Sequence, residues 1–169
     1  IPPLTELWQV AAATGAGLLL VWRIRHLRFG RAMIAIREDD VAAEAMGINL
    51  TRTKLLSFTL GALIAGIGFA SVAAVQQTWQ LPAAYALAAF GMGFVFPSFQ
   101  ALAADAVQAH EQGAAAGTVA AAQGLGMVAG PMLGTLLYRG GASLPYLLVG
   151  VLLLVLCVLA AAYRMKETP

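Results

Sequence analysis

Charge is scarce in this sequence of 169 residues, in which Asp, Glu, Lys and Arg make up 11%. Average soluble domains are about 25% charged. Three long stretches contain no Asp, Glu, Lys, Arg or His at all: Leu55–Ala104, Gln112–Tyr138 and Gly140–Tyr163. A soluble fold of this size needs far more polar surface. Because a run of about 18 or more apolar residues is long enough to cross a bilayer, the sequence predicts an integral membrane protein.

The sequence contains one cysteine and no recognisable catalytic pattern. Cys157, the single cysteine, lies in an apolar run, so it can build no disulfide framework or metal site, and we expect it in a packed core. No nucleophile–base set, phosphate loop or metal-ligand spacing is present. His110 and Glu111 are interpreted as a solvated pair in a polar link. We therefore expect no enzyme, no cofactor and no bound metal.

The apolar runs predict an all-α, polytopic membrane protein with about five transmembrane helices and one cytoplasmic surface helix. Short polar segments separate the runs, and they contain residues that favour turns and helix starts. The predicted spans are Leu7–Trp22, Leu55–Val75, Ala83–Ala104, Ala114–Tyr138 and Leu144–Tyr163. The lipid bilayer is thus the first expected partner.

Basic residues are distributed unevenly between the loops. Nine of the ten fall in the first loop or the C-terminal tail, which five spans place on the same side: Arg23, Arg25, Arg28, Arg31, Arg37, Arg52, Lys54, Arg164 and Lys166. Cytoplasmic loops carry the excess of Lys and Arg. The pattern therefore predicts an N-terminus outside the cell and a C-terminus in the cytoplasm, with Arg139 on the outer side. The basic loop lacks interleaved aromatics, so we expect no nucleic-acid partner.

The first loop also contains half of the eight acidic residues, in the stretch "AIREDDVAAEAMGINLTRTK". Arg31–Met46 is predicted to form one helix at the membrane surface, ended by Gly47, and Asn49 or Thr51 is predicted to cap the next span. The mixture of acids and bases argues against a purely lipid-binding patch. Two interpretations stay open: a solvated surface helix, and a docking helix for a cytoplasmic partner.

Small residues recur in the fourth predicted span. Gly126, Gly130 and Gly134 are spaced by four, which places them on one helix face, where small side chains let helices pack closely. Gly130-Pro131 is also predicted to bend this helix, because proline removes a backbone hydrogen bond.

Pro97 is predicted to bend the third span in the same way. Ser98 and Gln100 follow it directly and are the candidates there for polar groups facing a cavity. The alternative is that they bond a neighbouring helix.

The segment "FGRAMIAIREDDVAAEAMGINLTRTKLLSFTLGALIAGIGFA", Phe29–Ala70, resembles the permease subunits of branched-chain amino-acid ABC importers. In that family this loop carries a coupling helix that docks into a groove of the ATP-hydrolysing subunit. The pattern Ala42-Ala43-x-x-x-Gly47 is similar to the "EAA…G" loop of ABC permeases, with Val41 where the pattern has Glu. The resemblance implies an ATPase and another permease subunit as partners, and a bacterial plasma (inner) membrane as the location. It also implies a docking loop formed by Arg37, Glu38, Asp39, Ala42, Ala43, Glu44 and Gly47.

The segment "AAFGMGFVFPSFQALAADAVQAHEQGAAAGTVAAAQGLGMVAGPMLGTLLY", Ala88–Tyr138, resembles the last helices of major facilitator superfamily carriers, particularly drug/proton antiporters. The cues are Gly91-x-Gly93 before Pro97, then Glu111-Gln112-Gly113-x-x-x-Gly117, then Gly130-Pro131-x-x-Gly134. No ionisable residue lies at membrane depth, where proton-coupled carriers usually need one.

The chain therefore resembles a mosaic, in which residues 1–70 are permease-like and residues 71–169 are carrier-like, with the joint in Gly61–Val75. The predicted function is membrane transport, as a solute permease or part of one. Two alternatives stay open: a secondary-carrier fragment driven by a gradient, and an inserted chimeric fragment that does not transport.

Overall fold

The computed structural model describes residues 5–166, and these are almost entirely helical, with no strand among them. The all-α fold class predicted from the sequence is confirmed. The helices are α1 (Thr5–His26), α2 (Arg28–Glu38), α3 (Asp40–Ala45), α4 (Leu50–Ala73), α5 (Leu81–Asp105), α6 (Gln112–Gly140) and α7 (Leu144–Lys166), with the short 3-10 helices η1 (Thr78–Gln80) and η2 (Ala109–Glu111).

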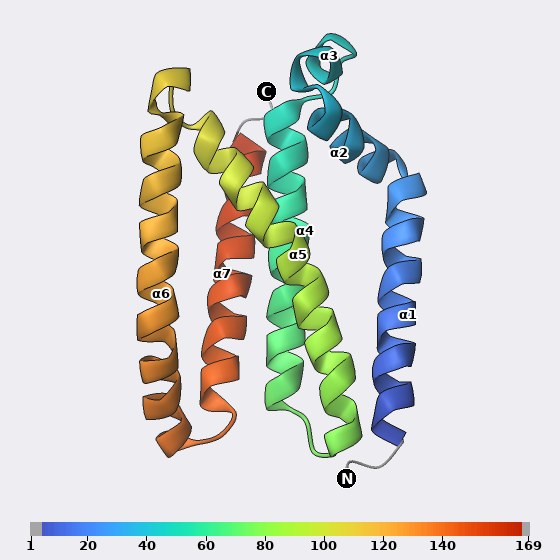
Figure 1. The fold of residues 1–169 in the computed structure, drawn as a ribbon, viewed down its shortest axis with the longest axis vertical. Helices are drawn as coiled ribbons and strands as arrows, with labels where there is room; N and C mark the ends of the chain where they lie inside the picture. Colours follow the sequence, from blue (N-terminus) through green and yellow to red (C-terminus); the bar gives the residue numbers. More distant parts are fainter. Residues whose placement is uncertain (1–4, 167–169) are drawn as a thin grey trace.

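The five long helices run side by side, and the short α2 and α3 gather at one end of them (Figure 1). Helix α4 is central, since it packs against both α5 and α7. Helices α1 and α6 lie at the two outer edges, and α3 extends beyond the ends of the long helices (Figure 1). The start of α1 and the end of α7 lie at opposite ends of the bundle, as an odd number of long helices requires.

Four helical segments of the described chain are long and apolar enough to cross a membrane: Leu50–Ala73, Leu81–Asp105, Ala109–Gly140 and Leu144–Tyr163. They correspond to the second to fifth predicted spans. The first predicted span, Leu7–Trp22, lies inside the 22-residue helix α1, which is not among the four. Its crossing of the membrane stays a prediction.

The contact between α4 and α5 is made by small residues that bring the two backbones close together. A Cβ added at Gly61 would lie 2.7 Å from the Cβ of Phe94 and 2.9 Å from the carbonyl oxygen of Gly91. A Cβ added at Gly91 would overlap the backbone of Ala65, and one at Gly68 that of Ala88. Such close approach maximises van der Waals contact, which drives helix association in lipid.

The contact between α4 and α7 also depends on glycines that let the two helices approach closely. A Cβ at Gly66 would lie 2.9 Å from the Cγ of Leu154, and one at Gly150 would lie 3.1 Å from the carbonyl oxygen of Gly66. The buried cluster beside it comprises Ala62, Val95 and Cys157. Cys157 is only 9% exposed, so the predicted core position of this cysteine is confirmed.

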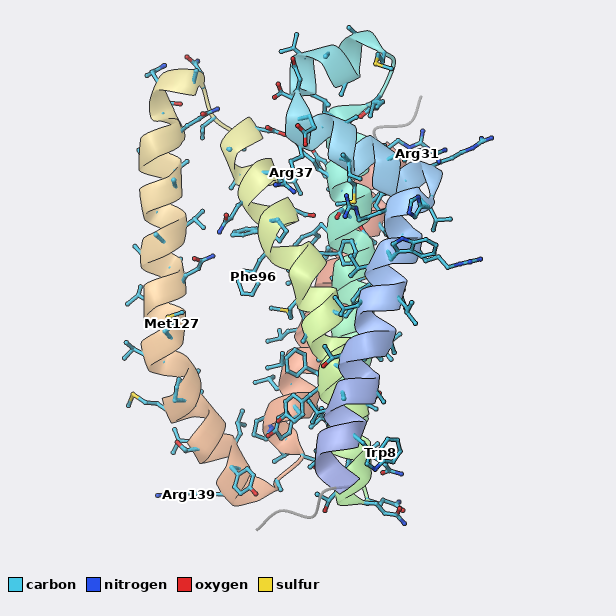
Figure 2. All side chains as sticks on the ribbon, turned by 45° about the vertical axis from the view of Figure 1, so that its right-hand side comes forward. Trp8, Arg31, Arg37, Phe96, Met127 and Arg139 are labelled. Carbon is cyan, nitrogen blue, oxygen red and sulfur yellow. The ribbon has the colours of Figure 1, made fainter. Side chains whose placement is uncertain are left out.

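Helix α6, like α1, has no buried residue among those described. A Cβ added at Gly126, Gly130 or Gly134 would meet nothing within 4 Å. Among the described residues no other helix therefore packs on this stripe, and its role in helix packing stays a prediction. The physical reason is that α6 stands at the outer edge of the bundle (Figure 1). The predicted bend is present: α6 contains Pro131 and changes direction between Met127 and Arg139 (Figure 2).

Candidate functional site

The segment that the sequence predicts to dock a partner, called the docking segment below, comprises α2, α3 and the turn to α4 (residues 28–49). It is two helices rather than the single predicted helix Arg31–Met46. The chain breaks at Asp39, whose φ of −159° and ψ of 109° are extended. The Asp39 side chain accepts a hydrogen bond of 2.9 Å from the backbone N–H of Ala42. Aspartate caps the start of a helix well, so α3 begins anew at this residue.

The end of the docking segment follows the sequence prediction. Gly47 has a φ of +83°, the left-handed conformation that glycine adopts without steric cost. The backbone N–H of Ile48 donates to the carbonyl of Ala43 at 3.0 Å, which closes the turn. Asn49, rather than Thr51, caps α4 by accepting a 2.8 Å hydrogen bond from the N–H of Arg52.

The start of the docking segment is held by a tight corner between α1 and α2. Gly30 is buried, and a Cβ at this position would overlap the carbonyl of Ile24. The guanidinium of Arg31 donates a 3.0 Å hydrogen bond to the carbonyl of His26, one of the last carbonyls of α1, where positive charge is favourable. The segment is thus fixed to the bundle at both ends.

Exposure separates the two alanines of the docking pattern. Ala43 is 2% exposed and faces its own chain, whereas Ala42 is exposed. The neighbouring Val41 is 74% exposed and Met46 is 80% exposed. The outward surface of α3 and its C-terminal cap therefore includes Val41, Ala42 and Met46, with the exposed acids Glu38, Asp40 and Glu44 around it. Arg37 is also exposed, and the side chain of Asp39 is already bonded to the backbone of Ala42 as the N-cap of α3.

An ion pair joins α4 to α5 beside the docking segment. The Nζ of Lys54 lies 2.6 Å from the Oδ2 of Asp105. The side chain of Lys54 is 13% exposed and that of Asp105 is 44% exposed. Sequence reasoning did not identify this pair, although both residues directly border the charge-free stretch Leu55–Ala104.

The two polar candidates after Pro97 line different cavities. Ser98 is 6% exposed and lines a cavity between α2, α4 and α5. Gln100 lines a smaller cavity of about 190 Å³ between α5 and α6. A substrate contact by either residue stays a prediction.

The two ends of the bundle differ in charge. Arg31 and Arg37 lie at the end with α3, and Arg139 lies at the opposite end (Figure 2). This separation is the one that the loop charges predict, and which end faces the cytoplasm stays a prediction. Among the described residues, no group of three or more His, Cys, Asp or Glu side chains is placed to hold a metal ion.

Four apolar helices of membrane-spanning length, three of which (α4, α5 and α7) pack through small residues, define an integral membrane protein of the polytopic helical class. The family model of the Major Facilitator Superfamily matches residues 45–169. The match covers more than half of the chain, so the chain belongs to the Major Facilitator Superfamily, and it is a membrane transport protein or part of one.

The curated relatives are of a second kind. The chain is 39% identical over 59 residues to the high-affinity branched-chain amino acid transport system permease protein LivM of Salmonella typhimurium. The aligned residues make up 35% of this chain and 14% of the relative. It is 37% identical over 59 residues to LivM of Escherichia coli, with the same coverage. The chain thus spans only a small part of the curated relatives it matches. No solved structure matches.

Both families named from the sequence are therefore found again by comparison. The superfamily match begins at residue 45, and α4 continues without a break from Leu50 to Ala73 across the predicted joint. The division into residues 1–70 and 71–169 stays a prediction.

Proposed function

We propose that this membrane transport protein is energised through its docking segment, which binds a cytoplasmic ATP-hydrolysing subunit. The observation that carries the proposal is the position of α3. This helix extends past the ends of the long helices (Figure 1). Val41 on the helix and Met46 at its C-terminal cap are 74% and 80% exposed. Covering two large apolar side chains with a partner removes their surface from water, at about 25 cal/mol per Å².

Charge around α3 indicates the chemistry of the partner groove. Glu38, Asp40 and Glu44 are exposed beside the apolar side chains, so a complementary groove is apolar at its centre and basic at its rim. The same proposal includes a second permease subunit, a bacterial plasma (inner) membrane, and a cytoplasmic location for α3. The likeness of 59 residues to a permease protein supports it.

A pull-down with the purified ATPase of a branched-chain amino-acid importer tests the docking proposal. Val41→Asp and Met46→Asp should abolish binding, because each buries a carboxylate in an apolar contact. Ala142→Asp is the matched control, since Ala142 is exposed in the turn between α6 and α7, at the end of the bundle opposite α3, and the change adds the same charge there (Figure 1). Equal binding by the wild type and both α3 variants would rule out docking through α3.

A tryptophan can be placed at either alanine of the docking pattern, and Ala42→Trp separates docking from folding more cleanly than a tryptophan at Ala43 does. Ala43 is 2% exposed, so a tryptophan there disturbs the turn itself, whereas Ala42 is exposed. Ala42→Trp should weaken ATPase binding while membrane insertion stays unchanged.

A second candidate function is that of a gradient-driven secondary carrier fragment, which the superfamily match over residues 45–169 favours. Ser98 and Gln100, which line cavities beside α5, are its candidate substrate contacts. Solute movement in vesicles under an imposed proton gradient without ATP would support this function. An inserted chain that neither binds the ATPase nor moves solute would support the third alternative, a non-transporting fragment.

A further inference from the structure

A cavity of about 450 Å³ lies between α2, α4 and α5, near the bundle end that carries α3. Its walls are mostly apolar and include Met33, Ile34, Ile36, Pro97 and Ala101. Small-molecule sites commonly have volumes of roughly 300–1,000 Å³, apolar walls and a few polar groups. This cavity has the size and the wall chemistry of such a site.

The first polar group of the cavity is the hydroxyl of Ser57 on α4. Ser57 is 1% exposed and lines the cavity, yet its Oγ has no hydrogen-bond partner within the described chain. Other hydroxyls of the same helix behave differently. Thr59 donates to the carbonyl of Leu55 at 2.7 Å, and Ser71 donates to that of Ile67 at 2.7 Å. An unpaired buried hydroxyl is costly, so the exception at Ser57 points to a bound partner.

The second polar group is the hydroxyl of Ser98 on α5, which is 6% exposed and lines the same cavity. Two buried hydroxyls from neighbouring helices thus meet one apolar space. A ligand with one oxygen-containing polar group can bond either hydroxyl, because a hydroxyl both donates and accepts.

The charges near the cavity balance one another. Arg37 and Asp40 line it, and Lys54, which also lines it, is paired with Asp105. Two cations and two anions leave no net charge to attract an ionic head group. The chemistry therefore favours an uncharged ligand.

We propose that this cavity binds an uncharged amphiphile, an apolar molecule with one hydroxyl or carbonyl group, through the hydroxyls of Ser57 and Ser98. The apolar body lies against Ile36, Pro97 and Ala101, where its burial supplies most of the affinity. The site does not depend on ATPase docking, since Asp40 is its one lining residue from α3, and the outward apolar residues Val41 and Met46 do not line it.

Photolabelling with a diazirine-bearing octanol tests the site in the full chain reconstituted in phosphatidylcholine vesicles. Adducts mapped by mass spectrometry should fall on the lining residues of α2, α4 and α5. Excess octanol should reduce these adducts several-fold, whereas octane, which lacks the hydroxyl, should compete much less. Ser57→Ala should lower the labelling about fivefold, the value of one hydrogen bond, and Ala101→Trp should remove it by filling the space.

Thr59→Val is the matched control. Thr59 lies two residues from Ser57 on the same helix, its hydroxyl is already bonded to Leu55, and it does not line the cavity, so labelling should not change. Labelling that is unchanged by Ser57→Ala, or equally displaced by octane, would overturn the proposal, as would a cavity that takes up water only and acquires no adduct. If Ala101→Trp does not insert into the membrane, Ser57→Ala and the octane competition still decide the result.

Discussion

Lys54 and Asp105 form an ion pair in which the Nζ lies 2.6 Å from the Oδ2, and no charged residue or histidine lies between them in the sequence. The two charges border the hairpin formed by α4 and α5, which has Lys54 near the start of α4 and Asp105 at the end of α5. Their contact closes the open end of this hairpin. It therefore fixes how far one helix slides along the other.

The first prediction concerns this ion pair. Asp105→Asn should lower the free energy of unfolding by about 1–3 kcal/mol, because it leaves a charged lysine side chain that is 13% exposed without its carboxylate. Lys54→Met should cost less, about 1 kcal/mol or below, since Asp105 is 44% exposed and water can solvate it. Unfolding in a detergent of fixed composition compares the two variants.

Arg52→Gln is the control, because Arg52 is exposed in the same turn of α4 and forms no ion pair within the described residues. A cost for Asp105→Asn no larger than that for Arg52→Gln would mean that the ion pair does not hold the hairpin together.

The second prediction compares glycines on two helices. Gly91→Leu should destabilise the bundle by about 1–3 kcal/mol or more, the cost of overpacking, because even a Cβ there overlaps the backbone of Ala65. Gly130→Leu should cost much less, since a Cβ at Gly130 meets nothing within 4 Å. Thermal unfolding of both variants in detergent compares these two losses of stability. A large loss for Gly130→Leu would show that another helix, outside this chain or in a second copy, covers the stripe on α6.

The third prediction concerns orientation. The basic end of the bundle should face the cytoplasm, so Ala142→Cys should react with a membrane-impermeant maleimide from outside intact cells and Glu111→Cys should not. Both positions are exposed, in turns at opposite ends of α6. Cys157→Ser removes the native thiol from both variants. Reaction at position 111 alone would invert the predicted topology.

The helices could be predicted from the sequence because their signals are long. Charge-free runs of membrane length located α4 to α7, and Gly47 and Asn49 marked the turn between α3 and α4. These signals depend on local composition and on backbone preferences, which neighbouring helices alter little. The break at Asp39 was missed because a capping aspartate inside a helix-forming stretch can also lie on a solvated helix face.

Helix packing was harder to predict. Small residues recur at helical spacing in several of the apolar runs, so the sequence alone does not show which of these faces are in contact. Among the described residues, nothing packs on the stripe singled out on α6. The buried contact instead joins α4 to α5, through Gly61, Ala65, Gly68 and Val72 of α4 and Ala84, Ala88, Gly91 and Val95 of α5. Both sets have the spacing four, three, four, which is that of a coiled-coil seam. This shared spacing is the signal that could have identified the pair. The burial of Ala43 had no such signal, since it depends on the break at Asp39.

The last prediction concerns Gly47, on which the shape of the docking segment depends. Gly47 has a φ of +83°, and an L-residue in this conformation costs about 1–2 kcal/mol. Gly47→Ala should therefore loosen the turn, and the amide of Ile48, which donates to the carbonyl of Ala43 at 3.0 Å, should exchange with deuterium several-fold faster.

Gly113→Ala is the matched control: Gly113 lies in α6 with a negative φ and open space around its Cα, so alanine there should leave exchange unchanged or slow it. If docking needs the ordered turn, Gly47→Ala should also weaken ATPase binding, whereas Gly113→Ala should not. Unchanged exchange at Ile48 in Gly47→Ala would mean that the turn does not depend on glycine, and the placement of α3 would need another cause.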